Sequence, residues 1–219
     1  MYQPPHFRED SIERQHSLIL EHPLGLLISG VGSEPVANAI PFTVYPGEGQ
    51  FGTLRCHVSR ANRQWRDLQE ASSCLVVFQG PQSYVTPSWY TAKAETGKVV
   101  PTWNYAMVQA AGRAKVIEEV GWLRRQLDDL TDVHEARFPR PWRVSDAPED
   151  FISNQIKGIV GIEIIIERLE GKWKISQNRP RQDRANVAAG LKALGGNEAM
   201  TGELVERYLT EVGELPQPD

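Results

Sequence analysis

The chain has 219 residues, of which 40% are hydrophobic and 24% charged, so it is long enough to bury one core and has the composition of an ordinary globular protein. Its net charge of −4 gives no general attraction to nucleic acid, and a DNA contact would need a local basic patch. No apolar run reaches membrane-spanning length, and the polar N-terminus shows no signal peptide. Cys56 and Cys74 lie in apolar runs and are expected to be reduced core thiols, so we expect a cytoplasmic protein with no membrane contact.

Short apolar runs separated by turn residues predict a chain that is mostly β with peripheral helices, of the α+β class. The expected strands are Leu24–Ser29, Val36–Phe42, Phe51–Ser59, Ser73–Gln79, Met107–Ile117, Ile159–Arg168 and Lys172–Asn178. Turns at Gly80-Pro81 and Glu170-Gly171 are expected to end two of these strands, and Gly112 to mark a bulge. The expected helices are Asp10–Glu21, Arg60–Glu70, Gly121–Phe138, a short one from Asp146 to Ile156, and two more that begin at Asp183 and Thr201.

The strand from Phe51 to Ser59 has two chemically different faces, because successive side chains of a strand point to opposite sides. One face is apolar or small, and the other is a row of hydrogen-bonding groups with a cation: Thr53, Arg55, His57 and Ser59. Ser59 is the expected N-cap of the next helix, and the turn also carries Arg60, Asn62 and Arg63. Free backbone N–H groups and arginines at a helix start are typical of a phosphate site, and the alternative is a capped helix with solvated arginines.

The stretch from Tyr84 to Tyr105 holds two of the six Trp and three of the six Tyr residues. Its clusters TPSWY and PTWNY flank a Lys/Gly linker, which indicates a hairpin. The aromatics either fill a small core or form a wall that holds an amphipathic ligand. The expected strand Lys172–Asn178 adds a second row of polar groups on one face, namely Lys172, Lys174, Ser176 and Asn178.

Several common chemistries are excluded by pattern. The chain has no GxGxxG, GxxxxGK[ST], GxSxG or HExxH motif and no zinc-ligand spacing, and Cys56 and His57 point to opposite faces of one strand. We therefore predict no catalytic residue and no metal ligand. The remaining features suit a phosphorylated planar ligand such as a flavin, since its phosphate needs arginine and hydroxyl donors and its ring needs an aromatic wall.

The strings MYQPPHF, LGLLIS, CHVSRANRQW, VFQGPQSYVTPSWY, VPTWNY, IVGIEI and LEGKWKISQNR occur in order over nearly the whole chain. They resemble the PaiB-type FMN-binding negative transcriptional regulators. The resemblance implies an FMN-binding split β-barrel, similar to pyridoxamine-phosphate oxidases, over residues 1–180, with a C-terminal helical extension over residues 181–219. It also implies FMN as cofactor and a homodimer with the flavin site at the subunit interface.

Carried over by motif, the resemblance assigns the phosphate side to Arg55, His57, Ser59, Arg60 and Asn62. It assigns the ring side or the dimer seam to Trp103, Asn104, Lys174, Ser176 and Gln177. Where the family often reads GHLARANPQW, this chain has Cys56, Val58, Ser59 and Arg63, and Arg63 adds a charge.

Two functions follow from the resemblance. The first is a homodimeric negative transcriptional regulator that binds FMN, and the alternative is an FMN-dependent oxidoreductase acting on a small substrate. A haem-handling barrel lacks support, because the C-terminal segment has no histidine to serve as an axial ligand. DNA as a direct partner has little basis in the residues, since the chain has no helix-turn-helix and NRPRQDR is a small basic patch in an acidic protein.

Overall fold

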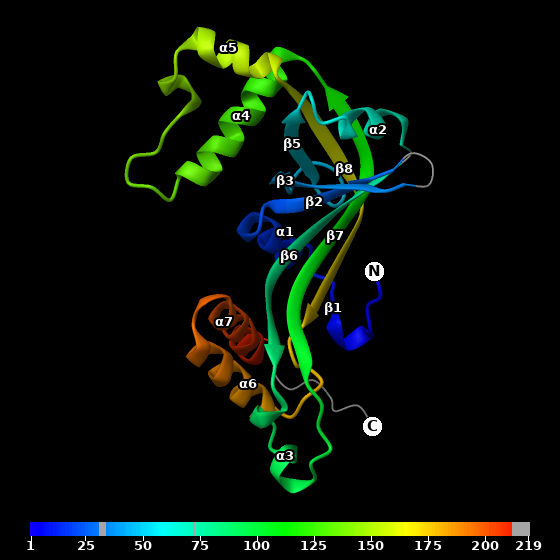
Figure 1. Cartoon of the computed structure of the whole chain (residues 1–219), viewed down its shortest axis with the longest axis vertical. Helices are drawn as coiled ribbons and strands as arrows, with labels where there is room; N and C mark the ends of the chain where they lie inside the picture. Colours follow the sequence, from blue (N-terminus) through cyan, green and yellow to red (C-terminus); the bar gives the residue numbers. More distant parts are fainter. Residues whose placement is uncertain (31–33, 72, 212–219) are drawn as a thin grey trace. The chain divides into compact units, whose positions relative to one another are not determined.

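The computed structural model describes residues 1–30, 34–71 and 73–211, and these ranges form antiparallel strands with helices beside them (Figure 1). The strands are β1 (Arg8–Glu9), β2 (Leu24–Ser29), β3 (Val36–Pro41), β4 (Thr43–Tyr45), β5 (Thr53–Ser59), β6 (Cys74–Val85), β7 (Thr102–Ile117) and β8 (Ile159–Lys174). The helices are α1 (Ile12–Glu21), α2 (Gln64–Glu70), α3 (Ala92–Glu95), α4 (Val120–Glu135), α5 (Glu149–Lys157), α6 (Arg181–Leu194) and α7 (Gly196–Glu211), with short 3-10 turns η1 (Pro5–Phe7), η2 (Pro87–Trp89) and η3 (Val144–Asp146). The expected class, mostly β with peripheral helices, is confirmed.

The strands are hydrogen-bonded in the order β3-β2-β6-β7-β8-β5-β4, and β1 pairs with β8. Strand β5 runs antiparallel to both neighbours, with Arg55 opposite Thr43 of β4 and Glu163 of β8. Opposite residues in an antiparallel pair share a face of the sheet. The polar row of β5 therefore faces the same side as Thr43 and Glu163.

The chain divides into two compact units. Unit 1 comprises residues 1–11, 79–108 and 170–219, and unit 2 comprises residues 12–78 and 109–169. The strands β6, β7 and β8 contribute residues to both units. Each unit has its own buried cluster, and each is described by itself below.

Unit 2 is built around the apolar faces of its strands. The two-faced pattern of β5 is confirmed, since Leu54, Cys56 and Val58 are buried. Helix α4 packs against β5, and a Cβ at Gly161 of β8 would lie 2.3 Å from the ring of Trp122. A glycine is required there because any side chain would displace that ring.

Unit 1 contains the helices α6 and α7, which lie side by side (Figure 1). Val187 and Leu191 of α6 are fully buried with Val85 and Tyr90. A Cβ at Gly190 would lie 2.3 Å from the Trp89 ring, so the glycine lets η2 approach the helix closely. The aromatic segment after β6 is thus anchored to α6.

Two expected turns are absent from the described strands. Strand β6 continues through Gly80-Pro81 to Val85, and the alternation of buried and exposed residues slips by one position there, so that Gln79 and Gln82 are both exposed. Strand β8 continues through Glu170-Gly171 to Lys174, because Gly171 pairs with Glu9 of β1. The predictions that strands end at Gly80-Pro81 and at Glu170-Gly171 were wrong, because both dipeptides are accommodated inside paired strands.

Other local expectations were corrected by the structure. Helix α2 begins at Gln64 and not at Arg60, so Ser59 is not its N-cap. The cluster TPSWY forms η2 and is not a strand, whereas most of PTWNY does lie on β7. At Gly112 the alternation of buried residues continues, and a Cβ there would lie 2.1 Å from the Ile165 carbonyl oxygen, so the glycine allows close approach of two backbones.

The two C-terminal helices confirm the helical character expected after residue 180, although α6 begins at Arg181 and α7 at Gly196. Residues 212–219 of the predicted extension lie outside the described residues. The boundary between a domain over residues 1–180 and an extension stays a prediction.

Candidate functional site

Arg55 of unit 2 is already paired with two carboxylates. Its Nε donates to Glu163 Oε2 at 2.8 Å and its Nη2 to Glu48 Oε2 at 2.7 Å, while the guanidinium carbon lies 4.2 Å from the centre of the Tyr45 ring. The Tyr45 hydroxyl donates to Asp129 Oδ2 at 2.5 Å. Burial, followed by this hydrogen bond, raises the pKa of Tyr45 to about 12.

His57 lies beneath α4 on the same face of β5. Its Nδ1 is 2.7 Å from Oε1 of Gln126, a side chain of α4 that is 2% exposed. The Nε2 of Gln126 is buried without a hydrogen-bond partner. The row of donors predicted on β5 is therefore real, but α4 packs over it.

The turn after β5 satisfies its own polar groups. Ser59 Oγ accepts from the Ala61 N–H at 3.3 Å, and Asn62 Oδ1 accepts from the Gln64 N–H at 3.1 Å. Arg60 donates to the carbonyl oxygens of Lys157 and Ile159 at 3.0 and 3.2 Å, and its Nη1 pairs with Glu118 at 2.5 Å. An incoming phosphate would compete with carboxylates at Arg55 and at Arg60, and the phosphate assignment stays a prediction.

The five ring-side residues of the prediction all belong to unit 1. Trp103 and Asn104 lie on β7, Lys174 ends β8, and Ser176 and Gln177 follow it. Asn104 Nδ2 donates to Ser176 Oγ at 3.0 Å, and Ser176 Oγ lies 3.1 Å from Asn104 Oδ1, both side chains being buried. This contact fixes the end of β8 against β7.

The turn after β8 is strained and internally bonded. Ser176 has φ of 67°, and it is the one residue other than glycine with positive φ in the part of the chain that the structure describes. Gln177 Oε1 accepts from the Ile175 N–H at 2.7 Å, and Gln177 Nε2 donates to the Trp173 carbonyl oxygen. Asn104, Ser176 and Gln177 therefore hold this turn in shape.

Two lysines on one face of β8 lack acidic partners. Lys174 Nζ donates to Thr102 Oγ1 and to the Trp103 carbonyl oxygen at 2.6 Å, and burial, with the nearby charges of Lys172 and Arg179, lowers the pKa of Lys174. Lys172 is 8% exposed, and its Nζ lies 5.3 and 5.5 Å from the ring centres of Tyr2 and Tyr105. Among the described residues, no carboxylate is in ion-pair range of either ammonium.

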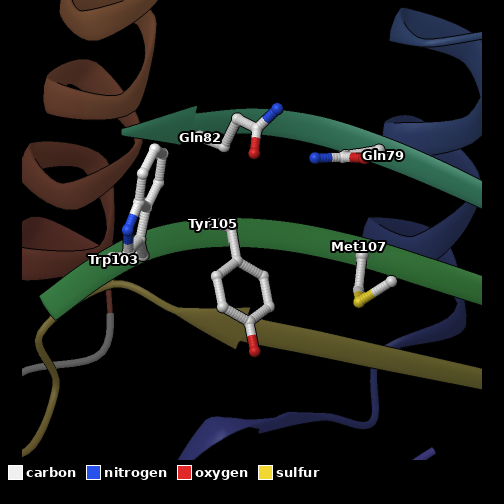
Figure 2. Close-up of a pocket in the computed structure, with 5 residues that line it drawn as sticks. All are labelled: Gln79, Gln82, Trp103, Tyr105 and Met107. Carbon is white, nitrogen blue, oxygen red and sulfur yellow. The ribbon is translucent and has the colours of Figure 1, made fainter. Parts of the chain in front are cut away.

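A hollow of about 450 Å³ lies in unit 1, and one of its lining side chains is Tyr105, whose ring centre is 5.5 Å from Lys172 Nζ. Figure 2 shows its lining side chains coming from two neighbouring strands; they are Gln79 and Gln82 of β6 and Trp103, Tyr105 and Met107 of β7. The indole of Trp103 is 53% exposed and meets the Tyr84 ring edge-on at 6.2 Å. An apolar wall, two carboxamides and nearby cations together suit a planar ligand that carries negative charge.

Of the lining residues, the sequence assigns only Trp103 to the site by number, although Tyr105 lies in the predicted aromatic stretch. Because alternate residues of a strand share a face, Tyr105 and Met107 could have been predicted to lie on the same face of β7 as Trp103. Gln79 and Gln82 were not recognisable, because they share a face only where the alternation slips at Gly80-Pro81. Among the described residues, no group of three His, Cys, Asp or Glu side chains is placed to hold a metal ion.

The sequence model of a family described as "Putative FMN-binding domain" matches residues 1–168. The chain belongs to this FMN-binding family. The expectation of FMN as the cofactor is confirmed at the level of the family.

Relatives of this chain align over most of their length. The chain is 35% identical to the uncharacterized protein AN0679 of Emericella nidulans, over 94% of this chain and 95% of the relative. It is 29% identical to the protease synthase and sporulation protein PAI 2 of Bacillus subtilis, over 95% of this chain and 98% of that protein. The resemblance to PaiB-type proteins is thereby confirmed.

Solved structures share the fold of this chain. The FAD and heme binding protein of Mycobacterium smegmatis matches with a TM-score of 0.58 and 21% identity, over 84% of this chain and 80% of that one. The flavocytochrome Anf3 of Azotobacter vinelandii matches with a TM-score of 0.57 and 15% identity, over 82% and 75%. These likenesses confirm the predicted split-barrel fold, and no described helix is long and apolar enough to cross a membrane.

Proposed function

We propose that this protein binds FMN, with the flavin ring in the hollow between β6 and β7. The observation that carries the proposal is the hollow itself, whose wall is aromatic and thioether, and the Lys172 ammonium lies 5.5 Å from its Tyr105 ring with no acidic partner among the described residues. Apolar walls with a few convergent polar groups are typical of cofactor sites. When bound, FMN supplies a ring that accepts and donates hydride or electrons.

The residues of the hollow fit this ring in their chemistry. Trp103, Tyr105 and Met107 offer apolar surface, and the carboxamides of Gln79 and Gln82 can donate and accept hydrogen bonds at a ring edge. The charges of Lys172 and Lys174 favour negative charge on a ligand. Lys172 contacts neighbouring rings and Lys174 donates to a backbone carbonyl oxygen, so both lysines need little reorganisation to interact with a negatively charged ligand.

For unit 2, taken by itself, we keep the sequence-based proposal that the turn from Ser59 to Asn62 binds a phosphate group. Arg60 supports this assignment because its side chain is 41% exposed, and Arg63 beside it is exposed. Glu118 is the carboxylate that the phosphate would have to displace from Arg60. The measurement is the dissociation constant of FMN in Arg60→Ala, and an unchanged value would remove the phosphate from this turn.

We propose further that the protein is a homodimer in which the flavin site lies at the subunit interface. The support is the exposed aromatic wall on β6 and β7, which combines Tyr84, Trp103 and the hollow. Exposed apolar patches of this kind are typical of interfaces. Sedimentation equilibrium should give twice the chain mass of 24.6 kDa, and a monomer at all concentrations would contradict the proposal.

The biological output that we propose is negative regulation of transcription of the PaiB type, in the cytoplasm. It rests on membership of the family and on the relative PAI 2, and the two free, buried cysteines fit a reducing compartment. Promoter fragments and unrelated DNA of equal length should be compared in binding assays at several salt concentrations. Equal affinity for both at every salt concentration would leave only non-specific binding and would contradict the regulator.

The alternative is an FMN-dependent oxidoreductase, and the unpaired cations Lys172 and Lys174 favour it. Positive charge beside a flavin ring favours its reduced, anionic form, so these lysines make reduction easier. Reduction of the bound flavin by NADH or NADPH with repeated turnover supports the enzyme. A flavin that is reduced only by dithionite and never turns over supports the regulator.

A matched pair of tryptophan variants tests the ring site. Trp103 lines the hollow, whereas Trp142 is similarly exposed (53% and 45%) but belongs to unit 2 and does not line it. Trp103→Ala should weaken FMN binding at least about fivefold, since stacking on an aromatic ring contributes about 1–3 kcal/mol. Trp142→Ala should bind like the unmodified protein, and equal affinities in both variants would place the ring elsewhere.

A further inference from the structure

The buried face of α6 carries a cation without a partner. Arg184 is 6% exposed and lies on the same helix face as Val187, Ala188 and Leu191, which are also buried. Its Nε and Nη1 have no hydrogen-bond partner. Within the described ranges, no carboxylate is in ion-pair distance of its guanidinium.

Both the burial and the position of Arg184 make an unpaired charge unfavourable. A guanidinium taken out of water loses its hydration, and proteins normally offset this loss with a carboxylate or with acceptor oxygens. Arg184 also lies in the first turn of a 14-residue helix, where the helix dipole is positive and favours anions over cations. The structure therefore places a buried guanidinium at the positive end of the helix dipole, and Asp183 is the acidic residue of that first turn.

A second unpaired donor lies against the same helix face. The Tyr90 hydroxyl is buried and has no hydrogen-bond partner, and Tyr90 packs with Val187 and Leu191, which follow Arg184 by one and two turns. Burial raises the pKa of Tyr90, so its hydroxyl keeps its proton and can donate. The guanidinium carbon of Arg179 lies 4.5 Å from the centre of the Tyr90 ring and adds another positive charge.

The acidic group next to this cluster is already engaged. Asp183 is 3% exposed, and its Oδ1 accepts from both the backbone N–H and the hydroxyl of Thr91, each at 2.9 Å. These bonds tie the start of α6 to the residue after Tyr90. Asp183 thus fixes the start of α6, while Nε and Nη1 of Arg184 and the Tyr90 hydroxyl remain without a hydrogen-bond partner.

We infer that Arg184, Arg179 and Tyr90 form a binding site for an oxyanion, either a phosphate or a carboxylate group. Guanidinium groups bind both kinds of oxygen pair well, and a phenol adds one neutral hydrogen bond. None of these residues lines the hollow between β6 and β7. The inference therefore does not depend on the proposed flavin site.

Thermal unfolding at constant ionic strength tests the site, with chloride replaced stepwise by inorganic phosphate or by acetate. The melting temperature should rise with the logarithm of the concentration of at least one of these anions, because a ligand that binds only the folded state stabilises it. Arg184→Met should lose this rise. Without added anion it should melt at or above the temperature of the unmodified protein, since the unpaired buried charge is gone.

Two further variants and two flavin ligands provide controls for this measurement. Lys192→Met removes a cation from the same helix, one that pairs with Glu206, and should keep the anion response. Tyr90→Phe removes only a hydroxyl and should weaken anion binding about threefold to tenfold, the contribution of one hydrogen bond. If Arg184→Met fails to fold, the anion response of Tyr90→Phe tests the proposed site instead. FMN and riboflavin at equal concentrations tell the sources apart, because only a flavin phosphate bound here would make the FMN shift depend on Arg184.

The inference is overturned if neither phosphate nor acetate shifts the melting temperature of the unmodified protein. It is equally overturned if Arg184→Met retains the shift. Absence of flavin binding together with a retained phosphate shift would refute the proposed function and leave the oxyanion site standing. Flavin binding without any anion-dependent rise in the melting temperature would refute the oxyanion site and leave the proposed function standing.

Discussion

Replacing Ser176 by alanine or by glycine separates two effects at the turn that ends β8. Ser176 shares two short contacts with the buried Asn104, and it adopts a positive φ of 67°. Alanine removes the hydroxyl and keeps the unfavourable backbone conformation. Glycine removes the hydroxyl too but tolerates positive φ without strain.

The expected free energies follow from these two contributions. Ser176→Ala leaves the Asn104 carboxamide buried without its partner and should lower the free energy of unfolding by about 2–3 kcal/mol. Ser176→Gly suffers the same loss but regains about 1–2 kcal/mol of backbone strain, so its net loss should be about 1 kcal/mol. The glycine variant should thus be the more stable one, the reverse of the usual order for ordered backbone.

Urea unfolding followed by tryptophan fluorescence measures both variants, and equal m-values show that the denatured states are comparable. Asn104→Ala and the double variant Asn104→Ala/Ser176→Ala complete a cycle, with an expected coupling of about 1–2 kcal/mol. An alanine variant as stable as the glycine variant would contradict the strained backbone. A coupling near zero would contradict the hydrogen-bonded pair.

Gly161→Val should lower the free energy of unfolding by at least about 2 kcal/mol, because a Cβ there lies 2.3 Å from the Trp122 ring and must displace it. Gly47→Ala is the control and should be neutral, since no atom lies within 4 Å of its new Cβ. If the two variants have similar melting temperatures, the close packing of α4 on β8 is disproved. Burial raises the pKa of Cys74 to about 12 from 9.0, so the thiol contributes stability that is complete below pH 9 and is lost as pH rises toward 12. Cys74→Ala should therefore lose less stability than the unmodified protein between pH 9 and 11 in urea unfolding, and parallel pH curves would show that the thiol is not buried in solution.

The sequence predicts the fold class and the chemistry of β5 well, because one residue in two along that strand is apolar and the pattern is local. Leu54, Cys56 and Val58 are buried as expected, and Arg55 and His57 lie on the other face. The pattern does not show which residues bind the polar side chains of β5. Glu163 is more than a hundred positions away from Arg55, and the helix that supplies Gln126 to His57 is expected as a helix but not at this place.

The errors at Gly80-Pro81 and Glu170-Gly171 have one physical cause. Glycine and proline favour turns in isolation, but pairing with a neighbouring strand can hold both inside an extended segment. Gly171 pairs with Glu9, which the sequence places at the opposite end of the chain. Without these two turns, β6, β7 and β8 are long, and the outward face of β6 and β7 bears the hollow that the sequence could not predict.

The sequence also could not predict which charged side chains lack an acidic partner. Lys172 and Lys174 are recognisable as neighbours on one face of a strand. Only the three-dimensional structure shows that no carboxylate of the described residues is in ion-pair range of either ammonium. The same holds for Arg184, which the helical period places among apolar residues without indicating whether an acidic group faces it.

The most direct test of flavin binding is an absorption spectrum of the full chain after incubation with excess FMN and removal of free flavin by gel filtration. We expect a yellow protein with a flavin spectrum at one FMN per chain, and less flavin retained by Trp103→Ala than by Trp142→Ala. Colourless protein that takes up no FMN under any of these conditions would contradict the assignment of the hollow between β6 and β7 to a flavin.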